Sequence, residues 1–318
     1  METEFSNGYP GWKQRPGGKP ETVLSRILPR ALPLGLGCLT LGAAQAFGAQ
    51  PEPWQIGMQP PQSPVAEQIQ DLHGFITAIM IAVVLLVLGL LIYVVVRFNA
   101  KANPTPSTVT HNTKIEVVWT LVPVLILAAI AVPSFRLLYF MDRVQEAEMT
   151  LKVTGHQWYW SYDYPDQKEI AFDAFLVDKD DLEEGQPRLL TTDSQVVLPT
   201  KTNIRVLITA DDVIHSWAMP ALGLKTDAVP GRLNETWVRI EEEGLYYGQC
   251  SELCGVNHGF MPIEIKAVSR KDFDGWVTAT AEDLGNPDAP TITLADKPIQ
   301  PAPGLDENKT EGQRLAAR

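Results

Sequence analysis

Cysteine is scarce in this chain of 318 residues, which contains only Cys38, Cys250 and Cys254. Three cysteines cannot make a disulfide scaffold, and the absence of a Cys-x-x-Cys-His motif excludes a covalently attached c-type haem. Cys38 lies in a segment that we expect to be removed from the mature protein. The two remaining thiols are therefore expected to serve a chemical role rather than a cross-linking one.

Positive charge is also in short supply. Lys and Arg number 26 against 38 Asp and Glu, so the formal net charge is -12. Between residues 142 and 274 the imbalance is steepest, with 24 acidic and 13 basic residues. Proteins that bind nucleic acid neutralise its phosphates with clustered Lys and Arg. The composition therefore excludes a nucleic-acid partner.

Residues 1–49 have the composition of a signal peptide. Two arginines precede an apolar stretch, 31–47, which ends around the small-x-small triplet 44–46. Cleavage after Ala46 fits this triplet, and cleavage near Ala49 also fits. A retained first membrane helix is the alternative, although the apolar run is short for a hydrocarbon layer of about 30 Å.

Two long runs without charge follow, at 75–96 and 117–135, and each is followed directly by an arginine. At about 1.5 Å per residue the first run is long enough to span a bilayer. A buried helical hairpin in a soluble protein is the alternative. We predict a transmembrane hairpin over 72–141 with helices at about 75–97 and 117–140, preceded by an irregular exported arm over 50–71.

The loop between the two runs carries Arg97, Lys101 and Lys114, and no acid before Glu116. Positively charged loops stay in the cytoplasm, so both outer flanks of the hairpin face the opposite side. We therefore expect a multi-pass protein of the bacterial inner (cytoplasmic) membrane, bound to the lipid bilayer, with its C-terminal domain in the periplasm.

From 150 to 283 the pattern changes to short runs rich in Val, Ile, Tyr, Trp and Thr. The runs 196–199, 204–208 and 236–240 are examples, and the last two alternate with period two. Such runs predict a β-sandwich or small barrel. Ser269 is placed to cap a short helix that closes the domain. Residues 284–318 lack the apolar content for a core, so we predict that they are disordered.

Four soft or borderline metal donors lie within twelve residues, namely Cys250, Cys254, His258 and Met261. Thiolate, imidazole and thioether together select copper. A blue site with one copper ion needs only one cysteine, whereas two thiolates can bridge two copper ions that share one added electron. Such a site transfers electrons rather than making bonds.

His215 precedes Cys250 by thirty-five residues and completes this donor set. A β-sandwich readily brings a loop at one strand end beside another loop that is distant in sequence. Two other interpretations are a surface disulfide between Cys250 and Cys254, or a core methionine with two incidental histidines.

From about 72 to 277 the chain resembles subunit II of the haem-copper cytochrome c oxidases. The resemblance depends on the motifs 155–162, 215–227 and 246–262. It implies a membrane-anchored all-β protein, in which a two-helix transmembrane hairpin carries a cupredoxin Greek-key β-sandwich or barrel. It also implies a dinuclear copper centre, CuA, whose ligands are His215, Cys250, Cys254, His258, Met261 and the main-chain carbonyl of Glu252.

The resemblance implies further roles. The carboxylate of Glu252 would bind a magnesium or manganese ion shared with subunit I, which alone carries the haems. Trp158 corresponds to the tryptophan that accepts electrons, while its neighbours Trp160, Tyr162 and Tyr164 fit core packing better. Glu116 corresponds to an acid at the mouth of a proton path into subunit I, with a plain interfacial helix cap as the alternative.

An acidic exported domain would attract a cationic protein donor, which the resemblance identifies as cytochrome c. We expect Asp163, Asp193 and Asp212 to be docking carboxylates, because they lie in or beside the motifs that carry the resemblance. Ordinary solubility accounts for most of the other acids.

The implied function is that of an oxidase subunit. It would accept electrons from reduced cytochrome c at CuA and pass them to the haem-copper centres of subunit I for oxygen reduction coupled to proton pumping. Subunits I and III would be its partners, and it would catalyse nothing alone. Alternatives are a CuA protein of another respiratory reductase, and a membrane-anchored copper chaperone, which would show a thioredoxin-like βαβ pattern. A quinol oxidase subunit would lack the copper ligands.

Overall fold

The computed structural model describes residues 48–105, 107–143 and 145–304. Almost all of the predicted signal peptide, 1–49, lies outside these residues. Of that segment only Gly48 and Ala49 are described. Ala49 is buried, and its amide donates to the carbonyl of Leu245 (3.0 Å), so this end of the segment pairs with the folded domain.

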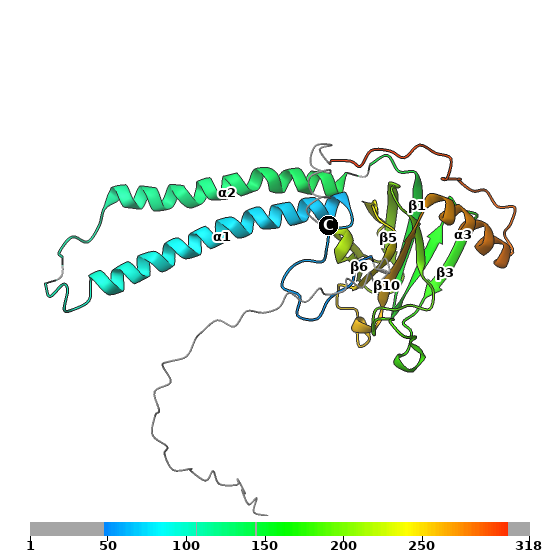
Figure 1. Ribbon diagram of the computed structural model, residues 1–318, viewed down its shortest axis with the longest axis horizontal. Helices are drawn as coiled ribbons and strands as arrows, with labels where there is room; N and C mark the ends of the chain where they lie inside the picture. The colour runs from blue at the N-terminus through cyan, green and yellow to red at the C-terminus, as the bar shows by residue number, and fades with distance from the viewer. Residues whose placement is uncertain (1–47, 106, 144, 305–318) are drawn as a thin grey trace, which may run out of the picture. The chain divides into compact units, whose positions relative to one another are not determined.

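Two long helices come first, α1 (Pro64–Arg97) and α2 (Thr113–Asp142), and they run side by side (Figure 1). Both are long and apolar enough to cross a membrane, and most of their large apolar side chains are exposed. Exposed apolar side chains along a whole helix favour a lipid environment over water. A soluble protein would bury such a hairpin.

Each helix begins earlier than predicted. α1 starts inside the segment that we predicted as an irregular arm, 50–71, because Ser63 caps it by accepting from the amide of Ala66 and a proline occupies the first helical position. α2 starts at Thr113 rather than near 117, because Asn112 accepts from the amides of the next turn. The caps, not the ends of the uncharged runs, set these boundaries.

The second part is a sandwich of two five-stranded sheets. The strands are β1 (Met149–His156), β2 (Tyr159–Tyr164), β3 (Ile170–Ala174), β4 (Val196–Pro199), β5 (Ile204–Ala210), β6 (His215–Met219), β7 (Leu224–Ala228), β8 (Asn234–Val238), β9 (Gly244–Cys250) and β10 (Pro262–Val268). One sheet has the order β3-β2-β1-β5-β8 and the other β4-β10-β9-β6-β7. The β1–β5 and β4–β10 pairs are parallel, and all the other pairs are antiparallel.

The sequence pattern explains the layers. In β1 and β5 every second side chain is buried, as expected for strands that turn one face to a core. Short 3-10 turns lie at Lys179–Asp181, Pro220–Leu222 and His258–Phe260. The predicted fold class, a two-helix hairpin followed by a β-sandwich, is confirmed.

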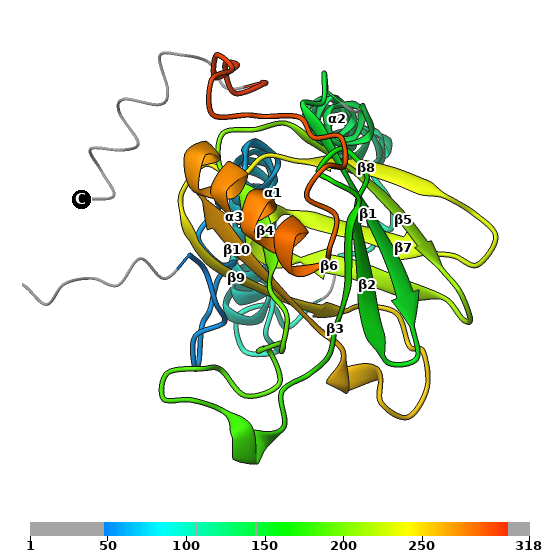
Figure 2. The ribbon, with the colours of Figure 1, turned by 90° about the vertical axis from the view of Figure 1, so that its right-hand side faces the viewer.

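Helix α3 (Arg270–Asp283) follows the last strand and contacts β4 of one sheet and β3 of the other (Figure 2). Ser269 caps it, as predicted, by accepting from the amide of Asp272. Phe273 and Val277 are buried, so the amphipathic face of α3 closes the end of the sandwich.

The prediction of disorder beyond 284 is wrong for the described part of that segment, 284–304. Leu294 is fully buried, and the Asp274 carboxylate accepts from the amides of Leu294 and Ala295 at 2.7–3.1 Å. Further on, Gln300 bonds to buried side chains of the domain. Average composition missed these few anchors, because one apolar residue and a few hydrogen bonds suffice to hold a short strap. Residues 305–318 lie outside the described residues.

Candidate metal centre

Three neighbouring strands of one sheet place the predicted ligands at a common end. His215 is the first residue of β6 and Cys250 is the last of β9, and these strands are antiparallel with Trp217 opposite Cys250. Met261 immediately precedes β10, and its carbonyl accepts from the Cys250 amide (3.2 Å). The β9–β10 connection between them holds Cys254 and His258. The sheet register therefore gathers all five side chains.

The sulfur and nitrogen atoms of these residues converge. The Sγ atoms of Cys250 and Cys254 lie 3.9 Å apart. Cys250 Sγ is 3.9 Å from His215 Nδ1, whereas Cys254 Sγ is 3.6 Å from His258 Nδ1 and 3.5 Å from Met261 Sδ. All but His258 are buried. Each sulfur thus faces a different imidazole.

This donor set fits a metal and not a disulfide. Both cysteines are free, and a separation of 3.9 Å is far beyond an S–S bond of about 2.05 Å. A tetrahedral metal that binds two thiolates at about 2.3 Å would hold the sulfurs about 3.8 Å apart. The ligand atoms of His215, Cys250 and Cys254 all lie within 4.8 Å of one another. The histidines are therefore not incidental.

Glu252 offers its two ends differently. Its main-chain oxygen lies 3.4 Å from Cys250 Sγ, at the edge of the cluster, while the residue as a whole is exposed. The carbonyl is thus available to the same site as the thiols, and the side chain reaches the surface.

The two thiols differ in acidity. Burial raises the pKa of Cys250. Hydrogen bonds to His215 and to the main chain lower it by a larger amount, so the net effect is a lowered pKa. Burial and the negative charge of Cys250 raise the pKa of Cys254. One thiolate beside one thiol is the expected state without metal, and metal binding to both sulfurs must release a proton.

Asp212 holds His215 in position. Its Oδ1 lies 2.8 Å from Nε2 of His215, which leaves Nδ1 directed at Cys250. Its carboxylate also accepts from the amides of Gln157 and Val213, both at 2.6 Å. Partial burial raises the pKa of Asp212, but these bonds lower it overall. The pKa of His215 is raised, because contacts with Cys250 and Asp212 outweigh burial.

Trp158 reaches the cluster through the main chain of a cysteine. Its indole nitrogen donates to the Cys254 carbonyl (3.2 Å), and the side-chain amide of Gln157 donates to the same oxygen (2.8 Å). Gly255 follows with φ +122°, and a Cβ there would lie 3.0 Å from the Trp158 ring. Glycine therefore allows the partly exposed indole to approach the loop closely.

Two models of known protein families match the two parts of the chain. A model described as the periplasmic domain of cytochrome c oxidase subunit II matches residues 149–268, and one described as its transmembrane domain matches 51–137. The chain belongs to the cytochrome c oxidase subunit II family. It is accordingly a membrane-anchored component of a haem-copper oxidase complex with a CuA-type periplasmic domain, and its cysteine and histidine cluster fits a copper site.

Individual relatives agree with this family. A probable cytochrome c oxidase subunit 2 of Rickettsia bellii is 52% identical over 248 residues, which cover 78% of this chain and 92% of the relative. Cytochrome c oxidase subunit 2 of Phytophthora megasperma is 52% identical over 231 residues, 71% and 87% of the two chains. The crystal structure of the periplasmic domain of subunit II of the Bradyrhizobium japonicum cytochrome oxidase is 49% identical, covers 44% of this chain and 99% of that one, and has a TM-score of 0.42.

Within this subunit II domain the aromatic motif divides as predicted. Trp160, Tyr162 and Tyr164 are buried in the core. Trp160 also serves the site, because its indole nitrogen donates to the Met261 carbonyl (3.4 Å) and its ring meets His215 edge-on. This second role was missed, and only the sheet register discloses it.

The three acids predicted to dock a donor lie in different settings. Asp163 is half-exposed and pairs with Lys152 (2.9 Å). Asp193 accepts from the amide of Phe175 (2.8 Å). Asp212 bonds to His215, while 32% of its side chain remains exposed. The sequence signal for this was its position three residues before a ligand.

Glu116 lies in the first turn of α2, where the helix dipole favours an acid. Its position at a helix start explains why an acid is tolerated beside an apolar span. The geometry is equally compatible with a capping role and with a proton path.

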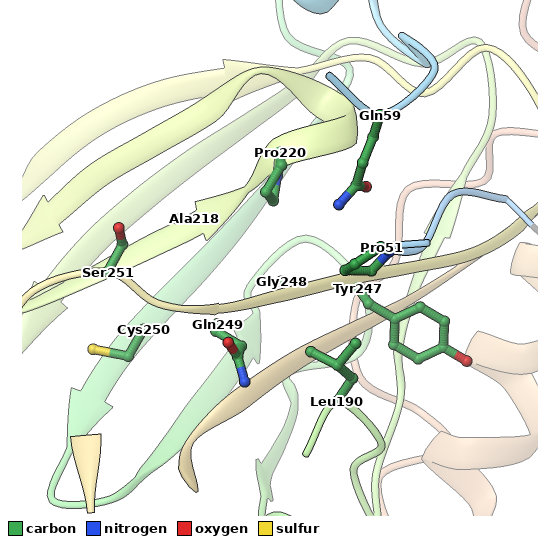
Figure 3. A pocket seen from close by; sticks show the side chains of 10 residues that line it. All are labelled: Pro51, Gln59, Leu190, Ala218, Pro220, Tyr247, Gly248, Gln249, Cys250 and Ser251. Atoms are coloured by element: carbon green, nitrogen blue, oxygen red, sulfur yellow. The ribbon is translucent and has the colours of Figure 1, made fainter. Parts of the chain in front are cut away.

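A cavity of about 240 Å³ lies near Cys250 and is lined by residues that include Gln59, Leu190, Tyr247 and Gln249 (Figure 3). The Cys250 sulfur points away from the other lining side chains in this view. Cys250 is itself a lining residue, so the cavity borders the donor cluster.

Proposed function

We propose that the chain accepts electrons from reduced cytochrome c at a dinuclear CuA centre and passes them to the haem-copper centres of subunit I. Oxygen reduction coupled to proton pumping follows there. The observation that supports this proposal best is the pairing of two sulfurs 3.9 Å apart with two different imidazoles. Such a set suits two metal ions bridged by thiolates better than one.

The proposed ligands are His215, Cys250, Cys254, His258, Met261 and the main-chain carbonyl of Glu252. When bound, a copper pair supplies a one-electron carrier whose charge is shared by two metals. The protein contributes a buried, soft-donor pocket that excludes water and keeps the ligands in place. Because the fold fixes these ligands, little rearrangement is needed on electron transfer.

Trp158 is the proposed point at which the electron is accepted. It is partly exposed, and a single hydrogen bond joins its indole to the carbonyl of Cys254. Surface aromatic residues also provide rigid contact area for a protein partner. The same residue therefore offers both a contact and a short bonded route to a ligand.

The remaining roles follow the same proposal. Asp163, Asp193 and Asp212 would help dock cytochrome c. The Glu252 carboxylate would bind magnesium or manganese shared with subunit I, and Glu116 would border a proton path. We also propose subunit III as a partner, a bacterial inner membrane with the C-terminal domain in the periplasm, and a cleaved signal peptide. Cleavage after Ala46 would keep the buried contact of Ala49 with Leu245.

The cysteines provide the test. In the purified oxidase complex, Cys250→Ser and Cys254→Ser should each abolish the electron paramagnetic resonance hyperfine pattern of one electron shared by two copper nuclei. The control Ser251→Ala, between the two ligands, should retain it. An unchanged shared-electron signal in both serine variants would show that the thiols do not hold the copper pair.

A further inference from the structure

We propose that Asp212 is a positioning residue that holds the ligand His215 and the turn at Gln157 and Trp158 in fixed positions relative to each other. It thereby sets the reduction potential of the copper centre. This inference rests on the proposed function, because it concerns the copper that His215 would bind. It adds to the docking role that the sequence suggested for Asp212.

The first part of the argument is the contact with His215. The imidazole is fully buried, and Asp212 is the polar group that bonds to its Nε2. A carboxylate at 2.8 Å keeps the proton on Nε2 and leaves Nδ1 as the free donor toward Cys250. The same contact makes the imidazole a stronger electron donor to a metal.

The second part is the link to Trp158. The other carboxylate oxygen of Asp212 accepts from the amide of Gln157 at 2.6 Å. The side chains of Gln157 and Trp158 then converge on the carbonyl oxygen of Cys254. One carboxylate is therefore bonded to the imidazole that faces Cys250 and, through Gln157 and Trp158, is linked to the main chain of Cys254.

The third part is what distinguishes Asp212 from Asp163. The amide of Val213 also donates to the Asp212 carboxylate. This carboxylate therefore bonds to three groups of the chain, in His215, Gln157 and Val213. Asp163, by contrast, pairs with the exposed Lys152 and has no described bond to a ligand residue. These two acids lie beside different motifs, 155–162 and 215–227, but their side chains are similarly exposed, at 38% and 32%, so they are suited to a matched comparison.

Electrostatics gives the direction of the effect. Reduction adds one electron, so the oxidised centre carries one more positive charge than the reduced centre. A carboxylate bonded to a ligand stabilises the more positive state and lowers the reduction potential. Replacing it with a neutral amide should therefore raise the potential and change the distribution of the unpaired electron.

The experiment compares D212N and D163N in the complete oxidase complex. Redox titration of the copper signal should show a positive shift for D212N and the wild-type potential for D163N. The copper hyperfine pattern should change only in D212N. Steady-state kinetics should show a several-fold higher KM for cytochrome c in D163N.

Two other results would overturn the proposal. The first is a D212N complex with wild-type potential and hyperfine pattern whose KM alone rises, as expected of a docking acid. The second concerns a D212N complex that assembles without copper: Asp212→Glu, which restores the carboxylate, should then regain copper, and its failure to do so counts against the proposal. If the wild-type complex itself lacks a shared-electron signal, the proposed function fails instead.

Discussion

At the residue scale, the chemistry of the site depends on which atom of each ligand faces inward. His215 presents Nδ1 because Asp212 occupies Nε2, and Glu252 can present its carbonyl while its side chain reaches the surface. Trp158 is joined to the β9–β10 connection by one hydrogen bond, which its indole nitrogen donates to the carbonyl of Cys254. Hydrogen bonds from neighbouring residues to metal ligands orient those ligands and tune the metal.

The role of Trp158 can be tested by Trp158→Leu, which removes both the indole contact surface and its bond to the Cys254 carbonyl. Electron transfer from cytochrome c should slow by about tenfold or more, equivalent to about 1.4 kcal/mol in the barrier, with copper content unchanged. Stopped-flow reduction of the copper signal measures this rate.

The control for that experiment is Tyr159→Leu. Tyr159 stacks on His156 and Phe175 but has no described bond to residues 250–261, which hold all the proposed ligands except His215. Its replacement should slow the reaction much less. Equal slowing in the two variants would assign the effect to general loss of aromatic surface rather than to Trp158.

At the scale of elements, short local signals decide where helices begin and where the chain stays attached. The side chains of Ser63, Asn112 and Ser269 each accept a hydrogen bond from a main-chain amide in the first turn of a helix. The strap, residues 284–304, contains no helix or strand, yet its Leu294 inserts into the core. One buried side chain therefore stabilises a segment whose average composition suggests none.

Leu294→Ala tests the strap. Truncating a fully buried leucine should lower the free energy of unfolding by about 2–5 kcal/mol. Urea unfolding of the periplasmic part of the full chain, followed by tryptophan fluorescence, measures the loss. Ile299→Ala, at an exposed position of the same strap, should change it by no more than about 0.5 kcal/mol. Similar losses in both variants would mean that Leu294 does not anchor the strap.

At the scale of the whole molecule, charge and membrane attachment are divided between the two parts. The hairpin supplies the apolar anchor, while residues 142–274 carry 24 acidic and 13 basic residues. A surface of this sign attracts a cationic partner over distances of about a Debye length, which is about 10 Å at 0.1 M salt.

This division predicts a salt effect on the proposed reaction. The second-order rate of reduction by a cationic cytochrome c should fall as ionic strength rises, because salt screens the attraction. Stopped-flow measurements at several salt concentrations give the slope, and reduction by a small uncharged reductant should show almost none. A rate that rises with salt would contradict electrostatic docking.

Much of the protein is predictable from local sequence. Uncharged runs predicted the hairpin, alternating runs predicted the strands, and the spacing of Cys250, Cys254, His258 and Met261 predicted a shared metal site. These features are local because residues close in sequence must lie close in space. His215 was added because a β-sandwich can bring loops that are distant in sequence together, and the register of β6 and β9 explains its position.

The sequence by itself determined the class of the protein and its soft-donor set, because periodicity, charge and donor spacing are properties of short segments. Only the tertiary structure decided that Asp212 bonds to His215, that Trp160 supports Met261, and that Leu294 holds the strap. Each of these depends on contacts between residues far apart in the chain or on which way a side chain turns. Residue type and spacing alone do not specify such contacts.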